Sequence, residues 1–160
     1  IGTHNGYSVT FKEEAVRDMG RTASGVRGIR LREEDYVVGA ALMKEDQEVL
    51  VITEKGYGKR TKVSEYPVKG RGGKGIKTAN ITEKNGPLAG LTTVSGNEDI
   101  MLITDKGVII RFNVSTVSQT GRSTLGVRLM KMEADTKVVT MAAVEPEAVE
   151  QTVEEQATEE

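Results

Sequence analysis

The chain has 160 residues with no Cys, no Trp and one His, and its 22 basic and 24 acidic residues nearly cancel. The absence of Cys excludes disulfides and thiolate metal sites. No apolar run approaches the length of a membrane span and the sequence shows no secretory leader, so we expect a soluble cytoplasmic protein without a membrane partner.

A unit of about fifty residues is repeated three times along the chain. Its anchor is a turn followed by a strand, read as THNGYSVTF at 3–11, TEKGYGKRT at 53–61 and TDKGVIIRF at 104–112. The turn glycines are therefore equivalent, and a second glycine follows each of them 19 residues later: Gly6 and Gly25, Gly56 and Gly75, Gly107 and Gly126. A period near fifty built of short strands is typical of a propeller-like array.

The expected strands are short and rich in β-branched residues, and no segment has a helical period. The chain opens inside a strand, because Ile1 aligns with Val51, which suggests a piece of a larger array. The middle unit predicts strands at 37–43, 48–54, 57–63 and 75–81. The third predicts strands at 88–94, 99–105, 108–114 and 126–132, and a strand at 138–144 opens a fourth unit.

These elements predict an all-β fold over residues 1–144, with about three four-stranded blades of about 50 residues each; a β-sandwich is the structural alternative. We expect two-residue hairpin turns at Asn5-Gly6 and Lys55-Gly56, with positive φ at both positions. Residues 145–160 contain seven Glu and no Lys or Arg, which leaves 22 basic and 17 acidic residues on the body. This composition predicts a disordered acidic tail.

The glycine-rich loop at 69–75 admits three interpretations. Gly70, Gly72 and Gly75 satisfy G-x-G-x-x-G, but a dinucleotide site needs a helix to open there, and the following residues read as a strand. A phosphate-binding P-loop fails because Ile76 follows Gly75 where a lysine is required. The remaining interpretation, a flexible basic loop that approaches a phosphate backbone, is favoured.

Basic residues recur at fixed offsets from the second glycine. An arginine precedes it by four residues in every unit (Arg21, Arg71, Arg122), and a basic residue follows it by two (Arg27, Lys77, Arg128). Any one of these would be a solvated surface charge, but repetition predicts a basic belt along one edge of the array, to which the aligned pair Arg30 and Lys131 also belongs. The candidate DNA-binding residues are Arg21, Arg27, Lys55, Lys59, Arg60, Lys62, Lys69, Arg71, Lys74, Lys77, Lys106, Arg111, Arg122 and Arg128.

No catalytic or metal-binding constellation is predicted. The single histidine, His4, aligns with Glu54 and Asp105, so it reads as a variable turn residue. The carboxylates have no metal-ligand spacing, and the many Ser and Thr residues have no base to activate them.

The fifty-residue period, the apolar I-T-[E/D]-K-G strand and turn, and the K-G-R-G-G-K-G loop resemble the C-terminal domain of DNA gyrase A over essentially the whole chain. The resemblance implies a six-bladed β-pinwheel with a positively charged rim around which DNA wraps. The hallmark box of that family reads near Q-R-R-G-G-[RK]-G. Residues 70–75 keep its R-G-G-K-G core but lack the leading Gln-Arg, so we interpret them as a later-blade copy.

The resemblance further implies a non-catalytic module of an ATP-dependent type II topoisomerase of the bacterial cytoplasm and nucleoid. Its partners would be double-stranded DNA, the remainder of gyrase A, and gyrase B. No cofactor is expected in this chain, whereas the whole enzyme would use ATP and Mg²⁺, with its catalytic residues outside this chain. The acidic tail would either solubilise the module or compete with DNA for its surface.

Three alternatives stay open. The first is the related C-terminal domain of topoisomerase IV, which would serve decatenation and DNA-segment selection. The second is a propeller-type protein-interaction scaffold, and the third is a nucleotide-binding enzyme that uses the glycine-rich loop.

Overall fold

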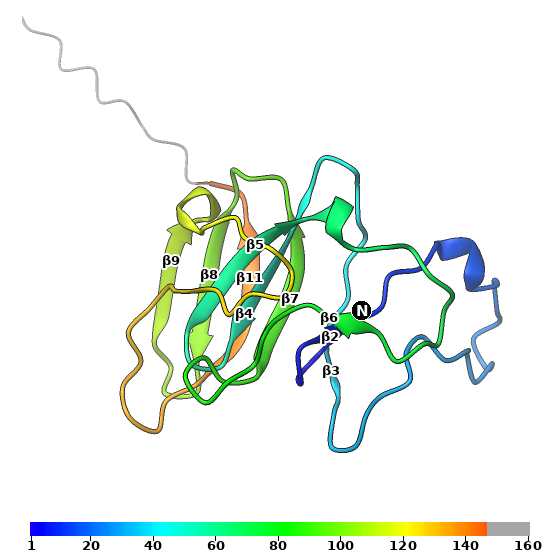
Figure 1. The fold of residues 1–160 in the computed structure, drawn as a ribbon, viewed down its shortest axis with the longest axis horizontal. Helices are drawn as coiled ribbons and strands as arrows, with labels where there is room; N and C mark the ends of the chain where they lie inside the picture. The colour runs from blue at the N-terminus through cyan, green and yellow to red at the C-terminus, as the bar shows by residue number, and fades with distance from the viewer. Residues whose placement is uncertain (147–160) are drawn as a thin grey trace, which may run out of the picture.

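The computed structural model describes residues 1–146, which form three antiparallel sheets (Figure 1). The first sheet has the order β3-β1-β2-β6, the second β10-β5-β4-β7 and the third β11-β8-β9. The strands are β1 (Gly2–Thr3), β2 (Tyr7–Ser8), β3 (Val37–Gly39), β4 (Glu48–Thr53), β5 (Tyr57–Lys62), β6 (Ile76–Lys77), β7 (Leu88–Val94), β8 (Asp99–Thr104), β9 (Ile109–Asn113), β10 (Val127–Arg128) and β11 (Val138–Val144). The expected acidic tail lies almost entirely outside the described residues.

Each unit of the repeat is divided between two sheets. The hairpin β4–β5 of the middle unit forms the centre of the second sheet, while β3 and β6 of the same unit flank the hairpin β1–β2 in the first sheet. The third unit repeats this, because β7 and β10 flank β4–β5. The array of short strands is thus confirmed, but a fifty-residue unit does not fold into a sheet of its own. Each of the first two hairpins receives both of its outer strands from the unit that follows, and the third hairpin, β8–β9, receives β11 within the described residues.

The outer strands β6 and β10 are shorter than the sequence predicts. The segments expected at 75–81 and 126–132 contribute only β6 and β10, of two residues each. Beyond β6 the amides of Thr78 and Ala79 both donate to the Gly6 carbonyl, and beyond β10 those of Leu129 and Met130 both donate to the Gly56 carbonyl. The chain therefore folds over the hairpin turn instead of continuing along the strand.

The hairpin turns differ from the expected two-residue type. In each, the turn glycine donates its amide to a threonine carbonyl three residues earlier, at 3.0–3.1 Å. Gly6, Gly56 and Gly107 have φ of +85°, +78° and +78°, but Asn5 and Lys55 are not in the left-handed region. Only the glycine needs positive φ, which is the pattern of a type I turn closed by a glycine bulge.

A short 3₁₀ turn follows the hairpin in every unit: η1 (Glu13–Ala15), η2 (Val63–Glu65) and η3 (Val114–Thr116). These turns lie at 50- and 51-residue intervals, so the repeat extends to irregular backbone. Three residues are too few to give a helical period in the sequence, and for that reason they were not predicted. No helix within residues 1–146 has the length and apolar character needed to cross a membrane.

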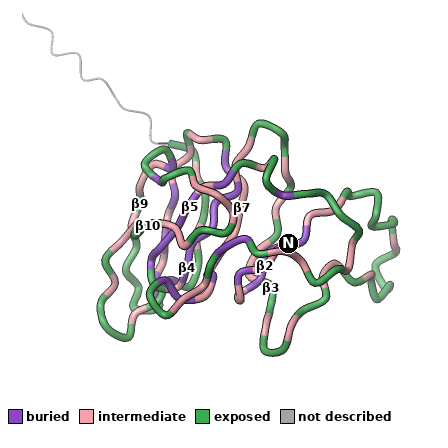
Figure 2. The backbone as a smooth tube through the Cα atoms, in the orientation of Figure 1, coloured by how far each residue is buried: buried purple, intermediate pink, exposed green. Residues whose placement is uncertain are grey.

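The core lies on both faces of the second sheet (Figure 2). Leu50 and Ile52 of β4 pack against Ile100 and Leu102 of β8, whereas Val49 and Val51 face Tyr66, Ala79 and Leu88. A strand covered on both faces reads as a continuous apolar run, which explains the sequence EVLVIT of β4. By contrast, β8 alternates between buried and half-buried positions. Each buried aliphatic side chain contributes about 1.5–3 kcal/mol.

Candidate nucleic-acid interface

Two of the three repeated arginines hold backbone rather than facing solvent. Arg71 donates from Nε to the Ala15 carbonyl at 2.8 Å and from Nη1 to the Arg27 carbonyl at 2.6 Å. Arg122 donates from the same two atoms to the Glu65 and Lys77 carbonyls, at 3.0 and 2.6 Å. The acceptors are equivalent by the repeat, so this arginine clamp joins neighbouring units. The fixed offset of the arginine has a structural cause.

Lys59 lies in the interior, contrary to the prediction that it faces solvent. It is 1% exposed, and its ammonium donates to the carbonyls of Gly121, Arg122 and Thr124 at 2.5–2.9 Å. Burial lowers the pKa of Lys59 to about 8, with nearby Glu65 raising it and Arg122 lowering it further. At neutral pH the ammonium is still protonated and holds the 121–124 loop against β5. A lysine in an alternating strand gives no signal of this in the sequence.

Four other candidate cations are engaged by neighbouring groups. Arg60 pairs with Glu48 at 2.7 Å and donates to the Val117 carbonyl, and Arg111 pairs with Asp99 at 2.8 Å. The Lys55 ammonium donates to the Glu83 carbonyl. Arg128 lies over the Tyr57 ring, 5.8 Å from its centroid, and its side chain remains exposed.

The remaining seven candidates are exposed and make no side-chain hydrogen bond or ion pair within residues 1–146: Arg21, Arg27, Lys62, Lys69, Lys74, Lys77 and Lys106. The basic set that follows the second glycine is exposed in every unit. Of its members, Lys77 and Arg128 lie on β6 and β10, the outermost strands of the first and second sheets. We call Arg27, Lys77 and Arg128 the outer belt.

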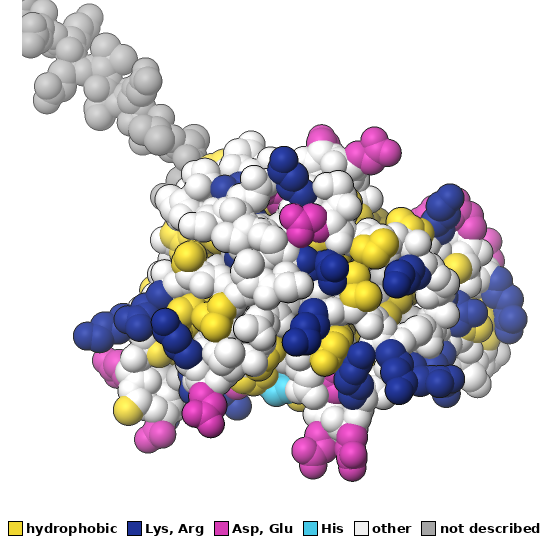
Figure 3. Space-filling view, viewed as in Figure 1, with side chains coloured by type: hydrophobic (Ala, Val, Ile, Leu, Met, Phe, Trp, Pro, Cys, Tyr) yellow, Lys and Arg dark blue, Asp and Glu magenta, His cyan; other side chains and the backbone are white. Residues whose placement is uncertain are grey.

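The glycine-rich loop and the end of the first unit lie side by side. The Gly72 amide donates to the Gly28 carbonyl and the Arg30 amide to the Gly73 carbonyl, both at 2.8 Å. We call residues 27–32 and 69–77 the basic corner, because these two segments hold seven basic residues and no Asp or Glu: Arg27, Arg30, Arg32, Lys69, Arg71, Lys74 and Lys77. Figure 3 shows Lys and Arg side chains gathered at the right of the visible face, over the lobe that these loops form in Figure 1.

Arg32 is the member of the basic corner that sequence reasoning missed. Its guanidinium lies 3.4 Å from the centroid of the Tyr7 ring and donates to the Lys74 carbonyl at 2.5 Å. The equivalent residues, Thr82 and Glu133, are not basic, so the repeat gives no signal at this position. Arg32 orders the loop that presents Lys74.

The surface near the second and third hairpin turns has mixed charge. A shallow cavity there is lined by Lys84 and Lys137 together with Glu54, Asp105, Glu133 and Asp135 among others. Mixed charge of this kind attracts a polyanion less strongly than a patch of one sign. Lys55, Lys131 and Arg128 of the outer belt also line this cavity.

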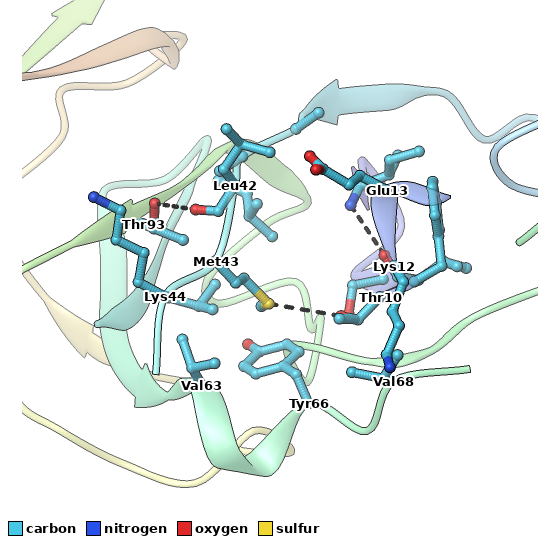
Figure 4. Close-up of a pocket in the computed structure, with 18 of the residues that line it drawn as sticks. Thr10, Lys12, Glu13, Leu42, Met43, Lys44, Val63, Tyr66, Val68 and Thr93 are labelled. Atoms are coloured by element: carbon cyan, nitrogen blue, oxygen red, sulfur yellow. Dashed lines mark hydrogen bonds between the residues drawn. The ribbon is translucent and has the colours of Figure 1, made fainter. Parts of the chain in front are cut away.

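A groove of about 800 Å³ lies between the first and second sheets. Met43 points into it between Tyr66 and Thr10, and the Thr10 hydroxyl lies 3.9 Å from the Met43 sulfur (Figure 4). Residues 10–12 and 41–43 form its walls. By the repeat they are equivalent to residues 60–62 of β5 and 92–94 of β7. In the second sheet those two segments lie on either side of Glu48–Leu50 of β4 and pair with it. The groove therefore occupies the place that a central strand fills in the second sheet, and its apolar lining is the surface of a core.

His4 is held within the fold. Its ring stacks on Tyr36 with the centroids 4.4 Å apart, and Nδ1 lies 3.9 Å from a Glu54 carboxylate oxygen. In residues 1–146, no three His, Cys, Asp or Glu side chains gather closely enough to hold a metal ion.

Known proteins share this architecture. The family model described as the DNA gyrase C-terminal domain, a beta-propeller, matches residues 1–42, 47–95 and 98–145. The DNA gyrase A protein of Staphylococcus aureus strain MRSA252 is 51% identical over 160 residues, which covers 99% of this chain and 18% of that protein.

Two solved structures have a similar fold. The DNA gyrase A C-terminal domain superposes with a TM-score of 0.83 at 26% identity, covering 89% of this chain and 49% of that one. The C-terminal domain of DNA topoisomerase IV superposes with a TM-score of 0.84 at 28% identity, covering 90% of this chain and 45% of that one.

Strand-exchanged sheets with basic outer strands place the chain in the class of propeller-like, all-β repeat domains, as its sequence predicts. The chain belongs to the DNA gyrase C-terminal domain family. It spans about a fifth of the length of the curated relatives that it matches.

Proposed function

We propose that this chain binds DNA and wraps it along the outer belt and the basic corner, as the wrapping module of a gyrase-type topoisomerase that introduces negative supercoils. In this proposal the chain performs no bond chemistry. DNA cleavage and ATP hydrolysis, with their Mg²⁺ and ATP, belong to the remainder of gyrase A and to gyrase B.

The observation that carries the proposal is the exposed outer belt. Arg27, Lys77 and Arg128 come from three different units, occupy equivalent positions and are all exposed. In this proposal a phosphate backbone runs along the edge of the array and meets one of these charges on each unit. Each neutralised phosphate releases condensed counterions, so such contacts supply sequence-independent affinity.

The basic corner supplies the largest local charge. Lys69, Lys74 and Lys77 are exposed there beside Arg27 and Arg30, and no acid lies within the two segments. Smoothly bending 20–30 base pairs by 40–90° costs about 1–6 kcal/mol, which several distributed phosphate contacts can offset. Wrapping is therefore energetically accessible to this surface.

The topoisomerase IV role is the second candidate. Its C-terminal domain superposes as well as that of gyrase, so the fold does not separate decatenation from supercoiling. The 51% identity to DNA gyrase A favours gyrase. The acid-free basic corner favours a polyanion over the protein partner of an interaction scaffold.

The test is a comparison of two double variants by fluorescence anisotropy with duplex DNA. Lys74→Ala with Lys77→Ala removes two exposed cations of the basic corner. We expect weaker binding to every DNA sequence, and a salt slope less steep by about 2, since each phosphate contact contributes about 0.9.

Lys84→Ala with Lys137→Ala is the matched control, because it removes the same charge from the mixed surface near Glu133 and Asp135. We expect its affinity to fall less than that of the basic-corner pair, because carboxylates already offset the cations of this surface, which Arg128 borders. Equal weakening by both pairs, or binding indifferent to salt, would refute the assigned surface. Wrapping is measured separately, by ligating nicked circular DNA with the chain bound, and an unchanged linking number would limit the chain to binding without wrapping.

A further inference from the structure

A buried tyrosine ring supports Arg128, the outer-belt residue of the second sheet. Tyr57 of β5 and Arg128 of β10 lie directly opposite each other in their antiparallel pair. The guanidinium lies 5.8 Å from the centroid of the Tyr57 ring, within the range of a cation–π contact, and its Nη2 atom donates to the Tyr57 hydroxyl oxygen at 3.4 Å. Tyr57 is 7% exposed, whereas Arg128 is exposed. A fixed ring therefore lies under a cation at the surface.

Acidic side chains lie around the same place. The cavity that Tyr57 and Arg128 line together also has four carboxylates in its wall, those of Glu54, Asp105, Glu133 and Asp135. Within residues 1–146 the Arg128 guanidinium makes no ion pair with any of them. By contrast, Arg60 and Arg111 do pair with acids. Arg128 therefore keeps its charge available although acids are near, and its contact with the Tyr57 ring provides a reason.

The first unit has a tyrosine at the same place, and an arginine lies over its ring as well. Tyr7 is equivalent to Tyr57, and the Arg32 guanidinium lies 3.4 Å from the centroid of its ring. The second unit has Thr82 where the first has Arg32. The Tyr57 ring is thereby left to Arg128, the basic residue on the strand opposite.

Outer-belt cations stay accessible where a further unit lies beside them. Lys77 has the place on the first sheet that Arg128 has on the second. Arg122 of the third unit holds the Lys77 carbonyl, so another unit is in place next to β6. Lys77 is exposed nevertheless. Accessibility is thus a property of this position in the array.

We propose that Tyr57 is a positioning residue for DNA binding, whose ring holds the Arg128 guanidinium toward a DNA phosphate and away from the neighbouring carboxylates. The inference rests on the proposed function of the outer belt. A guanidinium stacks on an aromatic face and is more weakly hydrated than an ammonium, so it suits such a support. A side chain that is already oriented loses less conformational freedom on binding. Tyr57 acts through Arg128 and makes no contact of its own with DNA.

The test is a double-mutant cycle on the 160-residue chain, with the affinity for duplex DNA measured by fluorescence anisotropy at several salt concentrations. Arg128→Ala should weaken binding and make the salt slope less steep by about 0.9, because one phosphate contact is lost. Tyr57→Leu should change the slope in the same direction and weaken binding about two- to fivefold, the equivalent of an exposed cation–π contact. Tyr57→Phe keeps the ring and should bind like the wild type. In the Arg128→Ala background, Tyr57→Leu should have no further effect on affinity.

Two further measurements separate this role from a purely structural one. Tyr66→Leu removes another buried tyrosine, one with no cation over its ring within residues 1–146, and should leave the salt slope unchanged. In the unaltered chain, NMR should show the Nε–H resonance of Arg128 displaced by the ring current of Tyr57. Exposed Arg27 has no aromatic ring beneath it in the described part of the chain and should lack that displacement.

The outcomes distinguish this inference from the proposed function. Suppose that Arg128→Ala weakens binding while Tyr57→Leu binds like the wild type, or weakens it equally with and without Arg128. Tyr57 then has no positioning role, although the outer belt stands. An Arg128 resonance without displacement, or Tyr57→Phe as weak as Tyr57→Leu, would also overturn the role of the ring. Wild-type binding by Arg128→Ala would refute its place in the outer belt and this role together.

Discussion

The threonine that opens each hairpin turn shows what a single residue contributes to this repeat. Thr3, Thr53 and Thr104 are buried, and the Oγ1 atom of each accepts the amide four residues later, at 3.3, 3.1 and 3.1 Å. A short hydroxyl side chain is well suited to satisfy that amide inside the turn. The threonine is therefore part of the turn chemistry together with the glycine.

Replacing Lys59 by methionine tests the buried ammonium. Lys59→Met leaves the carbonyls of Gly121, Arg122 and Thr124 without their common donor. We expect the free energy of unfolding to fall by about 1–3 kcal/mol, because the hydrogen bonds from a charged donor to these carbonyls are lost. Urea denaturation measures it. Lys62→Met, at an exposed position of the same strand, should change it by less than about 0.5 kcal/mol, and equal effects would contradict the role of Lys59.

Glu98 makes stability depend on pH. Burial alone would raise the pKa of its carboxyl, but hydrogen bonds from backbone amides, including those of Ser95, Gly96 and Asn97, outweigh it and hold this pKa below its usual value. A lowered folded-state pKa stabilises the fold above the unfolded-state pKa, and this contribution is lost as pH falls through the folded-state value.

Glu98→Gln should therefore destabilise the fold at pH 7 by less than about 1 kcal/mol, because a neutral amide oxygen is a weaker acceptor and solvent screens the effect at this partly exposed site. The difference from the wild type should shrink as the carboxyl becomes protonated in acid, which thermal unfolding at a series of pH values measures. Gln47, its equivalent by the repeat, accepts the Lys44 amide in the same way. Exposed Glu45→Gln serves as control, and a difference constant with pH would contradict this account.

At the scale of elements, strand exchange and the arginine clamp join successive units. Arg122 precedes β10 of the second sheet and holds Lys77 of β6 in the first sheet, so it ties together the outermost strands of neighbouring sheets. Those strands have only two residues each and so make few backbone hydrogen bonds with their neighbours. The clamp adds hydrogen bonds from the arginine side chain. The same strands present Lys77 and Arg128 to solvent.

Substituting lysine for arginine tests the clamp while keeping the charge. A single ammonium does not reproduce the forked donor geometry that reaches two carbonyls. We expect Arg71→Lys and Arg122→Lys each to lower the free energy of unfolding by about 1 kcal/mol. Arg21→Lys, at the equivalent position, should leave it unchanged, because Arg21 makes no side-chain hydrogen bond within residues 1–146. Denaturant titration of the three variants measures these free energies of unfolding. An equal decrease in all three would contradict the role of the arginine clamp.

The strand predictions succeed at the strands of six or seven residues. β7 and β11 match their expected ranges, while β4, β5 and β8 differ by a single residue at one end. β3 is also shorter than expected. The predictions fail at β6 and β10, because these strands end where the chain folds over the turn of a hairpin from another unit. Strand length there depends on the partner, and the partner lies in a distant part of the chain.

At the scale of the whole molecule, the fold sorts cations that look alike in sequence. Lys59 is enclosed, Arg71 and Arg122 hold neighbouring units, Arg60 and Arg111 pair with acids, and the outer belt is left for solvent. The fold brings the two acid-free basic segments together as the basic corner and leaves a mixed surface near the hairpin turns. In the proposed function this uneven distribution favours the basic corner as the contact for DNA.

The fold class, the period, the positions of the hairpin turns and the family can be predicted from the amino-acid sequence, because strand propensity, turn glycines and repeated offsets act locally along the chain. The sequence also indicated that the basic residue after the second glycine is exposed in every unit. It does not reveal the type of the hairpin turn, which strands share a sheet or which cations face solvent. The last two depend on contacts between residues about fifty positions apart, and an arginine has the same appearance in sequence whether its guanidinium meets a carbonyl or water.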